Sequence, residues 1–301
     1  MSTSEPHTAS AKGLDRLATE TGTFAMVAMD QRESLRAMLG DAGVPDGPED
    51  VLAFKRAVVE TLSPWATAIL LDRDALEGLP ARARAPECGL ILAADALTQE
   101  LGAPVTDTAI EEEVTRELAD AHGAEALKLL VIWRPDDRRE ERIEMVGRFV
   151  DRCREWELAS VVEGVVRPDP ARVDEFDREG ELLACAEALG GLGPDLYKAE
   201  VPLGGRGDPA GIEARCRELN VAARVPWVVL SQGVAIEDFP AAVEAACRAG
   251  ASGFLAGRAL WSDSVGASDV PASLRERAVP RLQGLRRTVE SIGRPWLEAG
   301  G

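Results

Sequence analysis

The chain has 301 residues, with 52 Asp and Glu against 34 Lys and Arg, and its formal net charge at pH 7 is −18. This acidity argues against nucleic acid or an anionic membrane surface as a partner, because both attract basic surfaces. The only histidines are His7 and His122, so the sequence lacks the ligands of a histidine-rich metal site. We therefore expect a protein that binds no metal and no cofactor.

Cysteine usage and hydropathy point to the cytoplasm. The cysteines are odd in number and never form a Cys-x-x-Cys pair, which favours neither a disulfide framework nor a zinc knuckle; they are Cys88, Cys153, Cys185, Cys216 and Cys247. No apolar run approaches the roughly 20 residues that span a bilayer. Residues 1–12 lack an apolar signal core, so we expect a disordered tail followed by one domain over residues 13–301.

Short apolar runs recur along the chain, each followed by a longer segment. The runs are continuous rather than alternating, which is typical of strands buried on both faces of a parallel sheet. In chain order, we expect strands over residues 24–30, 68–72, 89–95, 126–133, 160–166, 196–201, 226–233 and 253–261.

Most segments between these runs are amphipathic and carry helix signals, such as Pro135, which suits a first helical turn. We expect helices over residues 49–62, 106–122, 135–157, 174–189, 209–220, 236–249 and 274–291, the last interrupted by Pro280. The segment after the second strand is a poor helix, because residues 76–89 contain two prolines. Eight buried strands alternating with helices predict an α/β fold, a single (β/α)8 TIM barrel. A doubly wound open sheet is the alternative that alternation alone leaves open.

Active sites of TIM barrels lie at the carboxyl ends of the strands, and polar residues gather there in this sequence. They are Asp30, Gln31, Arg32, Asp72, Asp95, Glu163, Lys198, Glu200, Ser231, Gln232, Gly233, Gly257 and Arg258. Ionisable groups interrupt the apolar runs too often for a barrel with a purely structural role.

Lys198 is the sharpest signal, because it lies inside the apolar run LYKAEV. Burial disfavours the ammonium form, and a neutral lysine amine can form a Schiff base with a ketone. The alternative is a structural ion pair of Lys198 with Glu200 or Glu163.

Lys128, Glu163 and Asp30 lie in or beside neighbouring runs. Lys128 could act as a second cation near Lys198 or as a donor to a substrate hydroxyl, and otherwise forms a core ion pair with Glu163 or Asp30. Glu163 is the best candidate for a general acid and base, and is otherwise the counterion of Lys128. Asp30 fits a similar role, or that of a loop or helix-capping carboxylate.

The last two strands end in loops that suit an anion. Ser231 and Gly233 end the seventh expected strand, and Gly257 and Arg258 lie in the eighth. These loops form the usual phosphate site of a TIM barrel, and an arginine adds a planar, charged fork. Taken singly, each loop could also contain only ordinary turn glycines and a surface arginine with no role in binding.

Six segments in collinear order resemble the class I aldolases of the tagatose-bisphosphate aldolase superfamily, and within it the sulfofructosephosphate aldolases. The segments are FAMVAMDQRESLRAML, ALKLLVIWRPDD, SVVEGVVRP, DLYKAEVPL, PWVVLSQGV and GASGFLAGRALW. The resemblance covers residues 14–290. It implies a metal-free lyase that cleaves a ketose 1-phosphate through a Schiff-base lysine, as well as self-association into a homo-oligomer.

The resemblance also implies roles for individual residues. The Schiff-base lysine falls on Lys198, and the other catalytic positions fall on Glu163, Lys128 and Asp30. The phosphate loops fall on Ser231, Gly233, Gly257 and Arg258. Gln31 and Arg32 are expected to recognise the far end of the substrate. The chain departs from the family pattern at Gly164, where proline is usual, and at Gln232, where a small residue is usual.

We therefore expect reversible cleavage of 6-deoxy-6-sulfofructose 1-phosphate to dihydroxyacetone phosphate and 3-sulfolactaldehyde. The alternative within catalysis is a tagatose or fructose 1,6-bisphosphate aldolase. The alternative from another class of protein is a barrel that binds a sugar phosphate without turnover.

Overall fold

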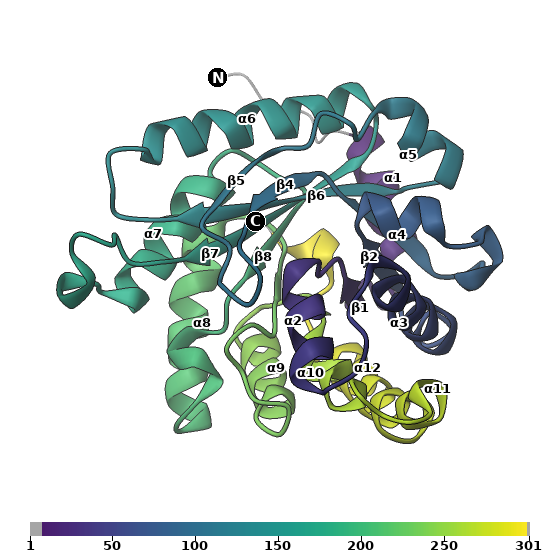
Figure 1. Cartoon of the computed structure of the whole chain (residues 1–301). Helices are drawn as coiled ribbons and strands as arrows, with labels where there is room; N and C mark the ends of the chain where they lie inside the picture. Colours follow the sequence, from purple (N-terminus) through teal and green to yellow (C-terminus); the bar gives the residue numbers. More distant parts are fainter. Residues whose placement is uncertain (1–7, 300–301) are drawn as a thin grey trace.

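The structure is a computed structural model, which describes residues 8–299. Eight parallel strands close into a barrel in the order β1-β2-β3-β6-β7-β8-β9-β10, and helices surround them (Figure 1). The barrel strands are β1 (Phe24–Met29), β2 (Ala68–Leu71), β3 (Gly89–Ala93), β6 (Ala126–Trp133), β7 (Ala159–Val166), β8 (Leu196–Ala199), β9 (Trp227–Val229) and β10 (Gly253–Ala256).

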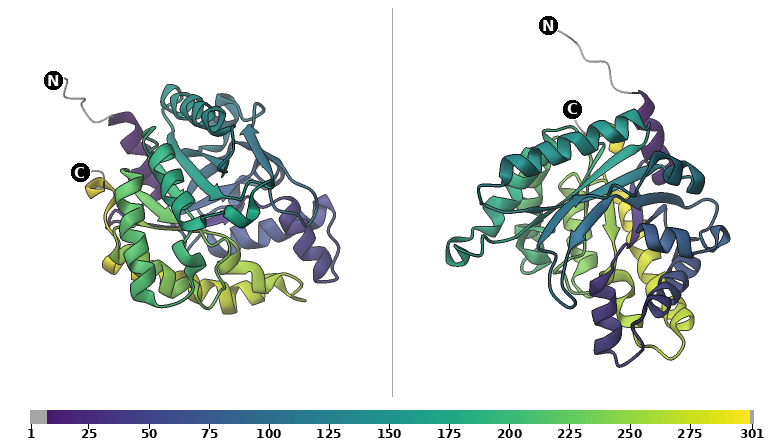
Figure 2. Two further views of the ribbon diagram at one scale, coloured as in Figure 1. Left: turned by 90° about the vertical axis from the view of Figure 1, so that its left-hand side faces the viewer. Right: turned by 45° about the horizontal axis from the view of Figure 1, so that its top comes forward.

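Twelve α-helices are present within residues 8–299, and Figure 2 shows from two further sides how they enclose the strands. They are α1 (Thr8–Leu17), α2 (Glu33–Asp41), α3 (Pro48–Leu62), α4 (Arg73–Gly78), α5 (Arg116–His122), α6 (Arg139–Glu155), α7 (Arg178–Gly190), α8 (Pro209–Ala223), α9 (Phe239–Arg248), α10 (Arg258–Trp261), α11 (Val270–Ser273) and α12 (Val279–Ile292).

Closure of the barrel decides between the two predicted topologies. β1 pairs in parallel with β10, Phe24 opposite Gly253, and also with β2, Val27 opposite Ile69. A sheet whose first strand pairs with its last has no edge, so the TIM barrel is confirmed and the open sheet is wrong. All eight predicted strands are present, with ends at most five residues from those expected.

The strands form a wall between two apolar cores. Side chains of alternate residues, such as Met26 and Val161, fill the barrel interior. The residues between them, such as Val27 and Val162, pack outward against the helices. Burial on both faces explains why these strands are continuous apolar runs in the sequence.

The amino ends of the strands are covered by α1, which packs against β3 and β7. Leu14 and Leu17 of this helix belong to the interior core, together with Trp296. The helix begins at Thr8, inside the segment expected to be a disordered tail. Residues 1–7 of that segment lie outside the described residues. The opposite end of the barrel, where the strands' carboxyl ends meet, is its mouth.

One predicted helix is partly wrong. The segment over residues 106–122 begins with strand β5 (Asp107–Ile110), and only its second half is helical, in α5. β5 pairs antiparallel with β4 (Asp95–Thr98), which makes a hairpin outside the barrel sheet. Figure 1 shows this β4–β5 hairpin in front of β6, which it contacts. Asp95 therefore starts β4 instead of ending the third barrel strand.

Smaller differences concern the ends of elements. The apolar run 253–261 is a strand only to Ala256, and its last four residues form α10. The expected helix from Pro135 starts at Arg139. Pro280 interrupts the last helix as expected, because a π-helical turn over Leu274–Ala278 precedes α12 and the proline falls in the first turn of α12.

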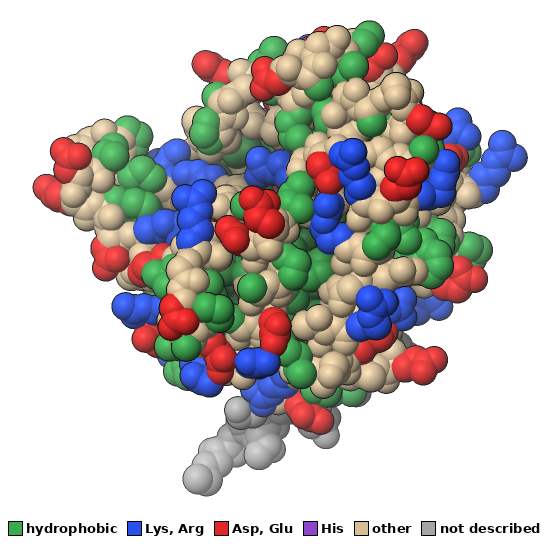
Figure 3. Space-filling view, turned by 90° about the horizontal axis from the view of Figure 1, so that it is seen from below, with side chains coloured by type: hydrophobic (Ala, Val, Ile, Leu, Met, Phe, Trp, Pro, Cys, Tyr) green, Lys and Arg blue, Asp and Glu red, His purple; other side chains and the backbone are tan. Residues whose placement is uncertain are grey.

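Charges of both signs cover one face of the molecule (Figure 3). On this face, Lys and Arg side chains are interspersed with Asp and Glu side chains. Within residues 8–299, no helix combines the length and the apolar composition that crossing a membrane requires.

Candidate active site

Alternation along β6 and β7 aligns their inward-facing side chains in layers. From the interior toward the mouth, β6 presents Lys128, then Leu130 and Ile132. β7 presents Glu163 and then Val165 beside them. Side chains of a strand alternate between its two faces, so residues two and four positions after Lys128 or Glu163 point into the barrel with it. The layer that holds Lys128 and Glu163 is thus followed, toward the mouth, by an apolar layer of Leu130, Ile132 and Val165.

Lys198 and Glu163 form a buried ion pair on adjacent strands. Their Cα atoms are register partners in β8 and β7, and Nζ of Lys198 donates to Oε2 of Glu163 at 2.9 Å. Both residues are buried, with 4% and 6% of their surfaces exposed. Glu163, and not Glu200, is therefore the partner of Lys198. Glu200 instead accepts the backbone N–H of Val166.

Lys128 lies among three carboxylates. Its ammonium is 2.8 Å from Oδ2 of Asp30, 2.9 Å from Oδ2 of Asp95 and 2.9 Å from Oε2 of Glu163. That glutamate oxygen is therefore shared by Lys128 and Lys198. The predicted catalytic residues Lys198, Glu163, Lys128 and Asp30 form one connected group, which we call the acid–base cluster.

Burial and charge act in opposite directions on this cluster. Burial raises the pKa of Asp30, but the ammonium groups of Lys128 and Lys198 outweigh it and hold that pKa well below its usual value. The same balance lowers the pKa of Glu163. For Lys128, burial alone would lower the pKa, and the charges of Asp30, Asp95 and Glu163 raise it well above its usual value. Lys128, Asp30 and Glu163 are therefore ionised together at neutral pH.

A cavity of about 450 Å³ opens above the cluster at the mouth of the barrel. Its walls come from the barrel strands, the loops that follow them, α2 and the β4–β5 hairpin. The polar side chains that line it are Asp30, Gln31, Arg32, Ser34, Asp41, Gln99, Lys128, Glu163, Arg167, Lys198, Gln232 and Arg258. The cavity is large enough for a phosphorylated sugar.

The predicted phosphate loops lie at the same cavity. Gly233 has a φ of +78°, which favours glycine, and a Cβ at Gly257 would lie 2.8 Å from the carbonyl oxygen of Ala28. Gly233 and Arg258 line the cavity, whereas Ser231 and Gly257 are buried and do not line it. Burial lowers the pKa of Arg258. Within residues 8–299, its guanidinium has no hydrogen-bond or ion-pair partner, so this charge is available to an anion.

Arg32 and Gln31 line the cavity on the side of β1. The guanidinium of Arg32 donates to the backbone carbonyl of Asp95 at 2.8 Å and to its carboxylate at 3.3 Å. The side-chain oxygen of Gln31 is buried without a hydrogen-bond partner among the described residues. Arg32 is therefore already paired, whereas Gln31 has an acceptor to spare.

Two further residues at this site had no predicted role. Asp95 holds Lys128, and Arg167 lines the cavity beyond Val165. Arg167 could have been found from the sequence, because it lies four residues after Glu163 and so shares its face. Asp95 was expected at the end of the third strand, but its contact with Lys128 could not be predicted, since that contact depends on the β4–β5 hairpin.

Comparison with protein families and curated proteins gives consistent matches. A family model described as DeoC/LacD family aldolase matches residues 24–263. The tagatose 1,6-diphosphate aldolase of Listeria monocytogenes serotype 4b (strain CLIP80459) is 28% identical over 316 aligned residues, which cover 94% of this chain and 92% of the relative. Tagatose 1,6-diphosphate aldolase 2 of Enterococcus faecalis is 28% identical, with 84% and 83% covered.

Solved structures share the fold at lower identity. A fructose-bisphosphate aldolase from Plasmodium falciparum superposes with a TM-score of 0.70 at 15% identity, covering 95% of each chain. A Schiff-base-forming fructose-1,6-bisphosphate aldolase superposes with a TM-score of 0.64 at 19% identity, covering 92% of this chain and 98% of the other. These likenesses concern the barrel architecture.

Proposed function

Because this chain belongs to the DeoC/LacD aldolase family, we propose that it is a class I aldolase that cleaves a ketose 1-phosphate through a Schiff base on Lys198. An aldolase is a lyase, so the chain is an enzyme of that class. The proposal rests above all on one contact, the 2.9 Å hydrogen bond from Nζ of Lys198 to Glu163 at the floor of the cavity. A lysine amine beside a carboxylate that can take its proton is what Schiff-base formation requires.

The first steps build the Schiff base. The ammonium of Lys198 gives a proton to Glu163, and the neutral amine attacks the C2 ketone to form a carbinolamine. Loss of the C2 hydroxyl as water, with Glu163 returning the proton, leaves an iminium on Lys198. Lys128 keeps a positive charge beside Glu163 and Asp30 throughout, which keeps both carboxylates deprotonated between the proton transfers.

The next steps break the carbon–carbon bond. Glu163 or Asp30 accepts the proton of the C4 hydroxyl, the C3–C4 bond breaks, and the aldehyde leaves. The electron pair of that bond moves into the iminium and gives an enamine. Protonation at C3 and addition of water at C2 then release dihydroxyacetone phosphate and the free lysine. Arg258 and the backbone N–H groups near Gly233 and Gly257 would hold the C1 phosphate, with Ser231 behind them.

The substrate that we propose is 6-deoxy-6-sulfofructose 1-phosphate, cleaved to dihydroxyacetone phosphate and 3-sulfolactaldehyde. This choice is supported by the sequence resemblance to sulfofructosephosphate aldolases. Tagatose 1,6-bisphosphate is the second candidate, supported by the curated relatives named as tagatose 1,6-diphosphate aldolases. Both are ketose 1-phosphates with a second anionic group at C6, and Gln31 and Arg32 would contact them from the β1 side.

Borohydride reduction in the presence of dihydroxyacetone phosphate tests the mechanism. The adduct should fall on Lys198 in peptide mass analysis, and the three other lysines of the chain serve as internal controls. A Lys198→Met variant should give no adduct. An adduct on another lysine, or none on the wild type, would refute the Schiff-base mechanism. Binding of the sugar phosphate without turnover would favour a barrel that only binds its ligand.

Cleavage rates on sulfofructose 1-phosphate and on tagatose and fructose 1,6-bisphosphate test the substrate. The sulfosugar should have the highest kcat/KM, and a clear preference for a bisphosphate would favour the second candidate. Activity should survive treatment with a chelator, since no step of the proposed mechanism uses a metal. Loss of activity that zinc restores would contradict that.

Two properties complete the proposal. The five cysteines are free and buried, which supports a reducing compartment such as the cytoplasm. We also propose that the chain self-associates into a homo-oligomer, which light scattering of the purified protein would test.

A further inference from the structure

Two arginines lie side by side where β6 and β7 end. Arg134 follows Trp133 and Arg167 follows Val166, and these two strand-end residues are register partners. The ladder continues one step further, because the N–H of Arg167 donates to the carbonyl of Trp133 at 2.8 Å. Arg134 and Arg167 therefore continue the inward-facing positions of their strands, above the apolar layer.

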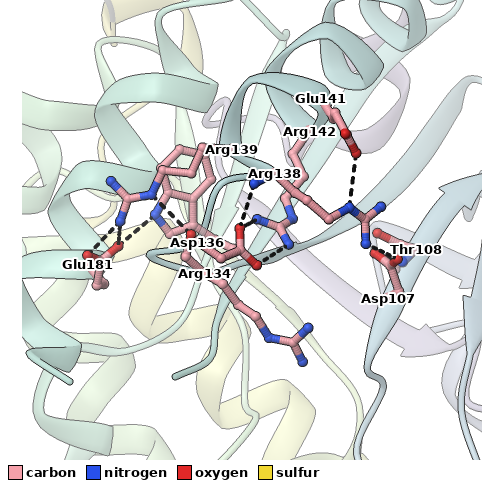
Figure 4. Close-up of polar contacts among 10 residues, drawn as sticks. Asp107, Thr108, Arg134, Asp136, Arg138, Arg139, Glu141, Arg142 and Glu181 are labelled. Carbon is pink, nitrogen blue, oxygen red and sulfur yellow. Dashed lines mark hydrogen bonds and ion pairs between the residues drawn. The ribbon is translucent and has the colours of Figure 1, made fainter. Parts of the chain in front are cut away.

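This arginine pair lacks matching counterions. Figure 4 shows no polar contact from the guanidinium of Arg134 to the other residues drawn, and the carboxylate of Asp136 pairs with Arg142 instead. Nε of Arg134 is buried and has no hydrogen-bond partner among the described residues. Like charges in neighbouring cross-strand positions repel each other, so two adjacent arginines without a bound anion destabilise the fold.

Within residues 8–299, Arg167, like Arg134, has no carboxylate of its own as a close ion-pair partner. Its guanidinium donates to the carbonyl of Val166 at 2.8 Å, and it lies 3.9 Å from Glu200. That carboxylate is shared with Arg178 and also accepts the N–H of Val166. Burial lowers the pKa of Arg167, and the charges of Arg178, Arg134 and Arg258 act in the same direction. The region thus has an excess of positive charge that a bound anion would neutralise.

We propose that Arg167, supported by Arg134, forms a second anion subsite, which holds the anionic group at the far end of the sugar. The inference rests on the proposed aldolase function. Arg167 lines the same cavity as Lys198 and Arg258. Its Cα lies about 13 Å along the strand from that of Glu163, which suits a group at the far end rather than the phosphate beside the attacked carbonyl.

Arg32 is the less suitable residue for this role. Its guanidinium is held by the carboxylate and the carbonyl of Asp95, whereas Arg134 and Arg167 have donors without a strong partner. The ligand chemistry is a tetrahedral oxyanion on C6 of a ketose 1-phosphate. A phosphate ester and a sulfonate both carry such an oxyanion, and the guanidinium of an arginine can donate two hydrogen bonds to either.

The experiment compares substrates that differ only in the far anion. Fructose 1,6-bisphosphate and fructose 1-phosphate are cleaved by the wild type and by Arg167→Gln, Arg134→Gln and Arg32→Gln, with 6-deoxy-6-sulfofructose 1-phosphate as a third substrate. Arg172→Gln is the matched control, because Arg172 is exposed in the loop between β7 and α7. Arg167→Gln should lower kcat/KM about 30-fold for both doubly anionic substrates and leave fructose 1-phosphate nearly unchanged.

The other variants show how much each arginine contributes to recognition of the far anion. Arg134→Gln should give the same selective loss to a smaller extent, and Arg172→Gln should give none. If the loss is larger for the sulfosugar than for the bisphosphate, the subsite takes a sulfonate, and the reverse identifies a phosphate site. An equal loss on fructose 1-phosphate, or a selective loss in Arg32→Gln instead, would overturn the assignment.

Trapping separates this inference from the proposed function. Dihydroxyacetone phosphate has no far-end anion, so its adduct on Lys198 should form equally in the wild type and in Arg167→Gln. If the wild type forms no adduct, the Schiff-base mechanism itself is wrong. If both proteins form the adduct but the selective loss is missing, only the second anion subsite is wrong.

Discussion

Asp95 places Oδ2 2.9 Å from Nζ of Lys128, although one residue starts the β4–β5 hairpin and the other lies in the barrel wall. The same oxygen accepts the N–H of Leu130 at 3.0 Å, and the other carboxylate oxygen lies 3.3 Å from Arg32. Asp95 therefore connects the hairpin that lines the cavity with the acid–base cluster. We regard it as a positioning residue for Lys128.

Asp95→Asn keeps the shape of the side chain and removes its charge. We expect kcat to fall about 10- to 100-fold, because Lys128 loses one of the carboxylates that orient it. Because Asp95 also raises the pKa of Lys128, the alkaline limb of the rate profile should move to lower pH. Asp107→Asn is the control, since Asp107 lies on the same hairpin and pairs with Arg138. An alkaline limb that stays in place would show that Asp95 is only structural.

The two cluster lysines should differ in their effect on stability. Lys128→Met leaves three buried carboxylates without their common cation, and should lower the free energy of unfolding by about 3–5 kcal/mol. Lys198→Met leaves Glu163 paired with Lys128 and should cost about 1 kcal/mol. Urea unfolding at pH 7 measures both. Equal losses would contradict the shared-cation arrangement, and adding Asp95→Asn to Lys128→Met should restore part of the stability.

The cluster also predicts how stability depends on pH. The pKa values of Asp30 and Glu163 lie below their usual 3.8 and 4.5, because the two lysines outweigh the effect of burial. Carboxylates with lowered pKa values stabilise the fold above those usual values, and this contribution is lost as the pH falls through the folded-state pKa values. Lys128, whose pKa is raised, contributes fully below its usual 10.5 and loses its contribution as the pH rises through the folded-state pKa.

We therefore expect the contribution of the cluster to the free energy of unfolding to be constant between about pH 5 and pH 10 and to fall on the acid side. Urea unfolding between about pH 2 and pH 5 should show a shallower dependence in Asp30→Asn than in the wild type. An unchanged slope would mean that Asp30 has an ordinary pKa in the folded state.

Gly164 is explained by its neighbours. A Cβ at this position would meet the hydroxyl of Tyr197 and would lie 2.6 Å from Sγ of Cys185. Gly164→Ala should therefore destabilise the fold by about 1–3 kcal/mol. Adding Tyr197→Phe, which removes the hydroxyl, should restore part of that loss. Gly147→Ala in α6 is the control, because no atom lies within 4 Å of its added Cβ; the alanine should be neutral or stabilising, by up to about 1 kcal/mol.

The barrel could be predicted from the sequence because its strands are buried on both faces, which produces continuous apolar runs such as ALKLLVIW. The β4–β5 hairpin could not, since each strand is only four residues long and partly exposed. The charged residues after Asp107 indicated a helix, and tertiary pairing with β4 decided otherwise for its first part.

The residues of the site could be predicted from the sequence more completely than the contacts between them. Ionisable residues within or at the end of apolar runs indicated Lys198, Lys128, Glu163 and Asp30, and the resemblance implied a catalytic role for each. The structure brings all four into one cluster. The sequence offered Glu163 as a partner of both lysines and Asp30 as a partner of Lys128, and these contacts are present. It did not give the contacts of Asp95. Arg32 was expected to recognise substrate, yet Asp95 holds its guanidinium, and no pattern in the sequence connects residues 63 positions apart.

The scarcity of lysine has a practical consequence. Lys55 is buried in an ion pair with Asp72, and Lys128 and Lys198 are buried in the acid–base cluster. The fourth lysine, Lys12, belongs to α1, which packs at the amino ends of β3 and β7. Amine-directed dyes, cross-linkers or resins should therefore spare Lys55, Lys128 and Lys198 in the folded enzyme. The enzyme could be labelled or immobilised through amines in this way without modification of its acid–base cluster.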